Sequence, residues 1–168
     1  MSSVEHGDAR HRRRLGNLIR ESLREVSSQL SLLNHQVSSQ LGIKDVDYDC
    51  LDLIGRHGPL SPSALAKAAG LHPATITGIL DRLERAGWVT RERDPADRRA
   101  VLIRARRDRG PEIFRLYTGM NAALDELIGG YTEAELTVLA DFLHRTADAG
   151  KAATDNLAAA DLSPGRDR

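Results

Sequence analysis

Apolar residues recur every three or four positions over the first part of the chain, from about residue 9 to residue 34. They are Leu15, Leu18, Ile19, Leu23, Val26, Leu30 and Leu33. This spacing is that of an amphipathic helix. Residues 1–8 are polar and lack the pattern, so we expect them to be disordered. The apolar stripe is too long for the short domain behind it to cover, so we expect it to pack against a C-terminal segment or a second chain.

A second helix is predicted over about 46–56, after a break at about 38–42. Tyr48, Leu51 and Ile54 recur at helical spacing in it. Asp45 stands where an N-cap is wanted, and the segment 57–59, His-Gly-Pro, ends the helix.

The stretch 61–87 predicts two short helices joined by a tight turn. Ser61 is an N-cap followed by Pro62, and Gly70 ends the first helix. The second helix starts at about Pro73 and ends near Gly87. Its apolar stripe consists of Ile76, Ile79, Leu80 and Leu83. Two short helices around a turn that contains glycine make a helix-turn-helix.

Two β-strands are predicted next, over 88–93 and 100–104, because both segments are rich in Val, Thr, Ile and Arg. The segment 94–97, Asp-Pro-Ala-Asp, has the residues of a turn, and Arg98 and Arg99 stand at its tip. A hairpin with a basic tip after a helix-turn-helix is the pattern of a winged helix-turn-helix.

The remainder of the chain again has the pattern of amphipathic helices. The apolar positions are Ile113, Leu116, Tyr117, Met120, Leu124, Leu127, Ile128, Leu136, Leu139, Leu143 and Leu157. Gly129 and Gly130 break the pattern, and Thr132 with Glu135 forms a capping box. The predicted organisation is therefore a first helix and connector over 9–44, a winged helix-turn-helix over 45–106, C-terminal helices over 107–160 and a polar tail over 161–168.

The segment LAKAAGLHPATITGILDRLERAGWVTRERDPADRRAVLIR resembles the MarR family of transcriptional regulators. The most specific element is Asp97-Arg98-Arg99 in the wing, a short distance after the helix with Asp81-Arg82-Leu83-Glu84 and its terminal Gly87. The resemblance is close over 46–104. It implies a mainly α fold, whose N- and C-terminal helices interleave with those of a second copy to form a two-fold dimer. It also implies a transcriptional regulator, most often a repressor, that binds a pseudo-palindromic duplex site and responds to a ligand.

The resemblance also implies which residues meet DNA, with the second helix of the motif in the major groove and one wing arginine in the minor groove. These residues are Ser61, Ser63, Pro73, Ala74, Thr75, Thr77, Gly78, Arg82, Arg91, Arg93, Asp97, Arg98 and Arg99. Asp97 would brace one tip arginine while the other enters the groove, and we favour Arg99 as the one that enters. Arg82 has an alternative role, an ion pair with Asp81, Glu84 or Asp97.

Two residues depart from the family pattern. Gly78 stands where many relatives have a longer polar side chain, so direct base reading would be sparser. His72 occupies an N-cap position, where we expect a solvated side chain rather than a phosphate contact.

The formal net charge of zero hides a local excess of positive charge. Residues 82–109 contain ten arginines and five acidic residues, and no lysine. Phosphate contact depends on this local field, and arginine offers a planar fork for it. The alternative is a solvated surface with many arginines.

Relatives often bind small phenolic or aromatic acids between the dimer helices and the winged lobe. The matching positions are Leu33, His35, Tyr48, Arg56, His57 and Tyr117. Each of them is alternatively a plain core or surface residue. Cys50, the single cysteine, excludes an internal disulfide and a cysteine zinc cluster. A buried structural thiol is the preferred interpretation of Cys50 over an oxidant sensor.

Other functional classes have weaker support in the sequence. A nominal triad from Ser61, Ser63, His57, His72 and Asp81 lacks an oxyanion loop, so we expect no enzyme and no cofactor. The six histidines lack close metal-ligand spacing, so we expect no metal site. A winged helix that contacts only proteins remains an alternative. No apolar run approaches the length of a membrane span, and the polar N-terminal residues lack the apolar core of a signal sequence, so we expect a cytoplasmic protein.

Overall fold

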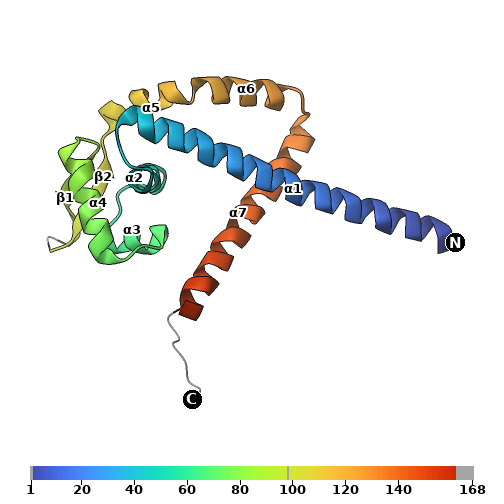
Figure 1. Cartoon of the computed structure of the whole chain (residues 1–168), viewed down its shortest axis with the longest axis horizontal. Coiled ribbons are helices and arrows are strands. Elements are labelled where there is room, and N and C mark those ends of the chain that lie inside the picture. Colours follow the sequence, from blue (N-terminus) through green and yellow to red (C-terminus); the bar gives the residue numbers. More distant parts are fainter. Residues whose placement is uncertain (1, 98, 162–168) are drawn as a thin grey trace, which may run out of the picture. The chain divides into compact units, whose positions relative to one another are not determined.

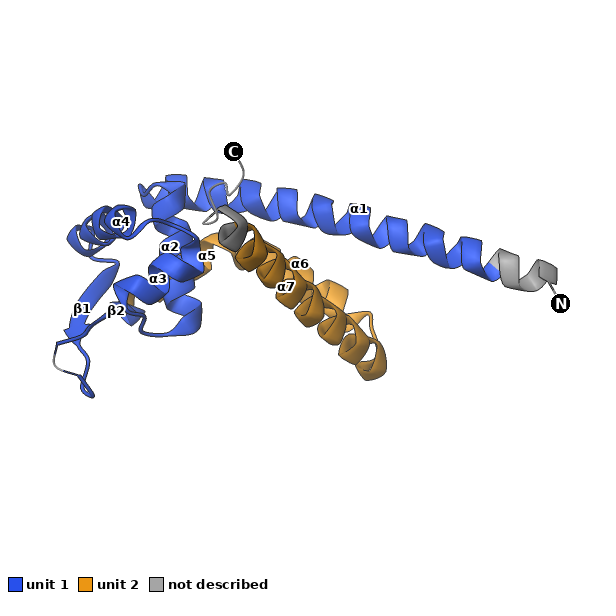
Figure 2. Ribbon diagram, turned by 90° about the horizontal axis from the view of Figure 1, so that it is seen from below, with its two compact units in different colours: residues 1–107 blue, residues 108–168 orange. Residues whose placement is uncertain are grey.

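The computed structural model of the chain describes residues 2–97 and 99–161, and it divides into two compact units, residues 1–107 and 108–168 (Figure 2). The first unit contains the helices α1 (Ser2–Leu41), α2 (Asp45–His57), α3 (Pro62–Ala69) and α4 (Pro73–Arg85), and the strands β1 (Val89–Arg93) and β2 (Val101–Ala105). The second contains α5 (Gly110–Leu116), α6 (Thr118–Gly129) and α7 (Glu133–Asp161), and a short 3₁₀ turn (Arg107–Arg109) joins the two. The predicted order of elements, a winged helix-turn-helix between long helices, is confirmed (Figure 1).

Helix α1 is longer at both ends than the sequence predicts. It begins at Ser2, where we expected disorder up to Asp8, and no proline interrupts it before Leu41. It also continues past Asn34 through the serine-rich segment in which we expected a break. The hydroxyl of Ser38 donates to the backbone oxygen of His35 at 2.9 Å, a bond that a serine makes without leaving the helix. The helix ends at Gly42, whose φ is 68°.

The winged module, by which we mean α2 to β2 (residues 45–105), contains nearly all of the core. The buried apolar residues are Val37, Tyr48, Cys50, Leu51, Ile54, Leu65, Ala66, Ile76, Ile79, Leu80, Leu83, Trp88, Val89 and Ile103. Only Val37 of these comes from α1. Three short helices and a hairpin therefore enclose one apolar core, and α4 presents its predicted apolar stripe to it.

The ends of α3 and α4 are formed by the residues that the sequence indicates. Ser61 accepts a hydrogen bond from the backbone nitrogen of Ala64 at 3.1 Å, which confirms its role as N-cap. Gly70 has the left-handed conformation, with φ of 64°, and the amide of Leu71 returns to the oxygen of Ala66 at 3.0 Å. The turn between the helices is thus closed by backbone bonds.

The wing is an antiparallel hairpin in which Val89 pairs with Ala105 and Arg93 with Val101. Strand β2 of the wing is joined to the residue before the helix-turn-helix, because Leu60 and Ile103 exchange two backbone hydrogen bonds of 3.0 and 2.7 Å. Ile103 is fully buried beneath them. The base of the wing is therefore fixed to the module, and only its outer end extends into solvent (Figure 1).

The second unit has a different character, because none of its side chains described over 108–157 is buried. The single helix predicted after the wing is divided at Tyr117, whose amide bonds to the oxygen of Phe114 at 3.1 Å. The predicted capping box is confirmed. The amide of Thr132 donates to Glu135 at 2.8 Å, and the amide of Glu135 donates to the hydroxyl of Thr132 at 3.4 Å. The polar tail beyond Asp161 lies outside the described residues.

Candidate nucleic-acid interface

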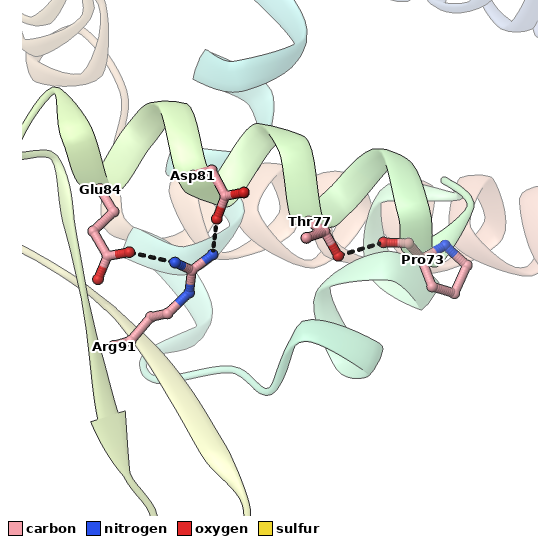
Figure 3. A network of polar contacts seen from close by, with 5 residues as sticks. All are labelled: Pro73, Thr77, Asp81, Glu84 and Arg91. Carbon is pink, nitrogen blue, oxygen red and sulfur yellow. Dashed lines mark hydrogen bonds and ion pairs between the residues drawn. The ribbon is translucent and has the colours of Figure 1, made fainter.

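The N-terminal half of α4 presents a face of small side chains to solvent. Ala74, Thr75 and Thr77 are exposed, because Ile76, Ile79 and Leu80 occupy the opposite, buried side. The hydroxyl of Thr77 donates to the backbone oxygen of Pro73 at 3.2 Å, which leaves its methyl group and lone pairs outward (Figure 3). Such a face can approach a base-pair edge closely.

We expected the side chain of His72 to be solvated only, but it makes a hydrogen bond within the chain. Its Nδ1 accepts a hydrogen bond from the backbone nitrogen of Ala74 at 3.2 Å, so the ring caps the start of α4. An imidazole takes here the role that serine or threonine usually fills. The consequence is that the first turn of α4 is capped from within the chain.

Arg82 forms an ion pair with a residue that the sequence did not suggest. Its Nε and Nη2 donate to the two carboxylate oxygens of Asp47 in α2, at 2.8 and 2.6 Å. The expected alternatives, Asp81, Glu84 and Asp97, are therefore not its partners. Hydrogen bonding to Asp47 raises the pKa of Arg82 above its ordinary value. Asp47 is only 3% exposed, and a buried carboxylate needs such a partner.

The sequence contains a pattern that could have indicated the buried position of Asp47 and its need for a cationic partner. Asp47 lies four and seven positions before Leu51 and Ile54, on the apolar stripe of its helix. An acidic residue on a buried stripe predicts a cation from another element.

Arg91 links the wing to α4. It leaves strand β1 and donates through Nη2 to Asp81 at 2.6 Å and through Nη1 to Glu84 (Figure 3). Hydrogen bonding to Asp81 raises the pKa of Arg91. This geometry indicates that Arg91 fixes the angle between the wing and the helix, in addition to any contact with phosphate.

The tip of the wing is shaped by two aspartates. Asp94 accepts a bond from the amide of Ala96 at 2.8 Å, and Asp97 accepts one from the amide of Arg99 at 2.9 Å. Asp97 thus braces Arg99 through its backbone. Within the described ranges, the guanidinium groups of Arg93 and Arg99 have no ion-pair partner, and both residues are exposed. Arg98 lies outside the described residues.

The start of α3 adds polar groups. The hydroxyls of Ser61 and Ser63 lie 3.0 Å apart, while Ser61 also caps the helix. Ser61, Ser63 and Pro73 thus stand at the N-terminal ends of α3 and α4, where the helix dipole favours a phosphate.

Comparisons with known proteins agree with this geometry. The family model described as "MarR family" matches residues 43–101. The uncharacterised HTH-type transcriptional regulator YcgE of Bacillus subtilis is 35% identical over 119 residues, which are 70% of this chain and 77% of that protein. The chain belongs to the MarR family.

Further relatives of this MarR-family chain are similar in sequence or structure. The HTH-type transcriptional regulator PecS of Dickeya dadantii is 29% identical over 76% of this chain and 79% of its own. The crystal structure of the transcriptional regulator Tm0710 of Thermotoga maritima matches with a TM-score of 0.58 at 25% identity, over 83% of this chain and 98% of that one. A MarR family protein from Bacillus stearothermophilus has a TM-score of 0.62 at 21% identity, over 83% and 97% of the two chains, which shows the shared fold. Our chain is thus a DNA-binding transcriptional regulator of this family.

The candidate effector residues of the MarR-family chain do not all come together. His35 and Tyr48 line a hollow of about 220 Å³ with Ser31, Asn34, Asp45 and Asp49. Arg56 is ion-paired with Asp52 and lines a neighbouring hollow of about 400 Å³, which shares Asn34 and Asp49 with the first. Leu33 is half-buried, His57 is exposed, and Tyr117 belongs to the second unit.

We expected Asp45 to be the N-cap of α2, and this prediction is wrong, because Lys44 occupies that position and Asp45 is the first residue of the helix. Its carboxylate instead accepts from Ser38 and lies 2.8 Å from Nδ1 of His35, and these bonds lower its pKa. Burial raises the pKa of Asp49, with a smaller contribution from the charges of Asp45 and Asp52. The hollow is acidic, and none of its six lining residues is Lys or Arg.

Cys50 is fully buried in α2. Burial, and then the charge of Asp47, raise the pKa of its thiol to about 11. A thiol that stays protonated and covered is a poor nucleophile, which supports a structural role.

Two findings concern absent features, and both refer only to the described part of the chain. No group of three or more His, Cys, Asp or Glu side chains there is arranged to hold a metal ion. No helix there combines the length and the apolar character that crossing a membrane requires.

Proposed function

We propose that the chain is a homodimeric, sequence-specific repressor that a small molecule releases from DNA. The observation that carries this proposal is the pairing of the small, exposed face of α4 with an arginine-rich wing whose base is fixed to the same module. Small side chains suit close approach in the major groove, and the wing arginines suit the minor groove beside it. The name of a relative, the HTH-type transcriptional repressor YetL of Bacillus subtilis, supports the sign of regulation.

The residues proposed to meet DNA divide into two classes. Ser61, Ser63, Arg91 and Arg93 would contact the phosphate backbone, which sets position and salt dependence but not sequence. Pro73, Ala74, Thr75, Thr77, Gly78 and Arg82 would face base edges. At the wing tip, Arg99 would enter the minor groove with Asp97 bonded to its backbone amide, and Arg98 remains a further DNA-contact candidate.

The exposed apolar residues outside the winged module support a two-fold dimer. In α1 they include Leu15, Leu18 and Ile19, and in α6 and α7 they include Leu127 and Val138. Such surfaces on one chain mark an interface, and an interface between identical chains is most often isologous. Two modules related by a two-fold axis would read half-sites about 34 Å apart, one turn of DNA.

The acidic hollow beside Tyr48 supports a refined effector class. Because Asp45 and Asp49 line it and none of its lining residues is Lys or Arg, a neutral phenol suits it better than an aromatic carboxylate, which the two carboxylates would repel. Binding there would shift the equilibrium between DNA-competent and released arrangements of the dimer.

The test is selection of genomic DNA fragments by the purified protein at two salt concentrations. A two-fold-symmetric motif whose affinity falls as salt rises supports the proposal. Absence of any enriched sequence refutes it and favours a winged helix that contacts proteins. Adding a neutral phenol and a matched benzoate to the selected complex then tests the effector class, since only the phenol should release the DNA.

A further inference from the structure

Position 78 of α4 lacks a side chain, and the guanidinium of Arg82 lies within ordinary van der Waals distance of the place that a Cβ atom there would take. A Cβ atom placed on Gly78 would lie 3.5 Å from Nη1 of Arg82, one helical turn further along. The guanidinium of Arg82 therefore lies back over Gly78, towards the N-terminal half of the helix. This is the half whose exposed residues, Ala74 and Thr75, form the face described above.

Asp47 determines which donors of Arg82 remain available. A guanidinium has five N–H groups, and Asp47 accepts one from Nε and one from Nη2. The remaining three belong to Nη1 and to the outer side of Nη2. Together they form an end-on fork, the geometry that binds two acceptors at once. Within the described residues, Nη1 makes no hydrogen bond, and the side chain of Arg82 is 39% exposed.

Burial makes this arrangement stiff. Asp47 is held in α2 beneath the surface, and its two bonds to Arg82 fix the plane of the guanidinium as well as its position. A long side chain that is ordered before binding loses less conformational entropy when it binds. Arg82 thus differs from Arg93 and Arg99, whose guanidinium groups have no such partner among the described residues.

We propose that Asp47 places the Arg82 fork beside position 78, so that Arg82 reads a guanine there in place of the missing side chain. Asp47 is then a positioning residue. This inference rests on the proposed function, because it assigns one base pair of each half-site to Arg82. The chemical basis is that a fork of two donors matches O6 and N7 of guanine.

A purely structural role for the pair is the competing explanation. In that case the bond between α2 and α4 would stabilise the module, and its loss would lower the melting temperature without changing which base is preferred at any position. The base preference at a single position therefore distinguishes the two roles, whereas affinity or stability alone does not.

The experiment measures binding of the wild-type chain, Arg82→Lys and Asp47→Asn to the selected duplex and to every single-base-pair variant of one half-site. The wild type should prefer G·C at one position by about 10-fold. Arg82→Lys keeps the charge but lacks the fork, and Asp47→Asn keeps the shape but loses one acceptor. Both should reduce that preference to about twofold or less, at the same position only, and leave the other positions unchanged.

Asp52→Asn is the matched control, because Asp52 is also an acid of α2 but pairs with Arg56 in its own helix. It should keep every wild-type preference. Circular dichroism melting of each variant reports the fold. If Asp47→Asn does not fold, Asp47→Glu takes its place, because it keeps the charge but moves the carboxylate, and it should reduce the same preference.

Two failures are distinguishable. If the wild type selects a motif and either variant keeps its preference at every position, the inference is overturned while the proposed function stands. If the wild type selects no motif, the proposed function falls and takes this inference with it.

Discussion

The winged module and the helices around it use apolar residues in opposite ways. In the module, large apolar side chains such as Leu80, Ile76 and Ile103 are 1% exposed or less. In the second unit, Leu127 is 64% exposed and Val138 is 68% exposed, and no side chain described over 108–157 is buried. Helix α1 shows both behaviours, since Val37 near its end is buried while Leu18 is exposed.

This difference separates two kinds of stability. The module encloses its own core, so its geometry, including the face of α4, is determined within one chain. The long helices have apolar stripes that their own unit leaves in water, at a cost of about 25 cal/mol for each Å² of apolar surface. We therefore assign DNA contact to the module and assembly to the helices, and these two roles should respond separately to substitution.

The largest expected effect is on assembly. Ile19→Asp places a charge in the exposed apolar stripe of α1, where the dimer would have to bury it, so the variant should be a monomer at micromolar concentration. Light scattering measures the mass. Ser28→Asp, two and a half helical turns further along and therefore on the opposite, polar side of α1, should remain a dimer. An intact Ile19→Asp dimer would move the interface elsewhere.

The next effect concerns the core of the module. Leu80→Ala should lower the free energy of unfolding by about 2–5 kcal/mol, because it leaves a cavity among buried side chains. Leu127→Ala, measured in the Ile19→Asp background to remove the dimer, should cost less than about 1 kcal/mol, since that side chain is already exposed. Urea unfolding gives both values. Equal losses would mean that the second unit has a core of its own.

A smaller effect is expected at the wing. Arg99→Ala should weaken operator binding about 10-fold and reduce the salt slope by about one, because one arginine–DNA contact is lost. Fluorescence anisotropy at several salt concentrations measures both quantities. Arg145→Ala in α7 removes the same charge from a residue paired with Asp141 and should change neither. Unchanged affinity in Arg99→Ala would remove the wing tip from the mechanism.

The smallest effect concerns Cys50. Its pKa of about 11, raised from 9.0, keeps the thiol protonated in the folded chain at neutral pH. A thiol reagent at pH 8 should therefore react far more slowly with the folded protein than with the protein in urea. Because the folded pKa is the higher one, the stability associated with this group is present below pH 9 and is lost as the pH rises from about 9 to 11. Rapid labelling of the folded chain would reopen a sensor role.

Local chemistry made much of the fold predictable. The cap at Ser61, the left-handed Gly70 and the capping box at Thr132 are set by neighbours within a few positions, and all are confirmed. The apolar stripe of α4 followed from its period in the same way. The division at Tyr117 did not, because one tightened turn leaves the apolar spacing on either side unchanged.

Contacts between distant residues were the ones that sequence reasoning missed. Arg82 and Asp47 are 35 positions apart, and the acids nearest to Arg82 in sequence were the expected partners. Asp45 was assigned to a cap because nothing local indicated that Ser38 and His35 would bond to it. The roles of the DNA-facing residues stay predictions, since they depend on a duplex that the chain meets from outside.

Native mass spectrometry of the wild-type chain with its selected duplex tests the central claim most directly. We expect a complex of two chains on one duplex. The amount of this complex should fall as the salt concentration of the solution in which protein and DNA are mixed before the measurement rises. A complex that contains one chain per duplex, or no complex with any duplex, would contradict the claim that two winged modules of a dimer read one site.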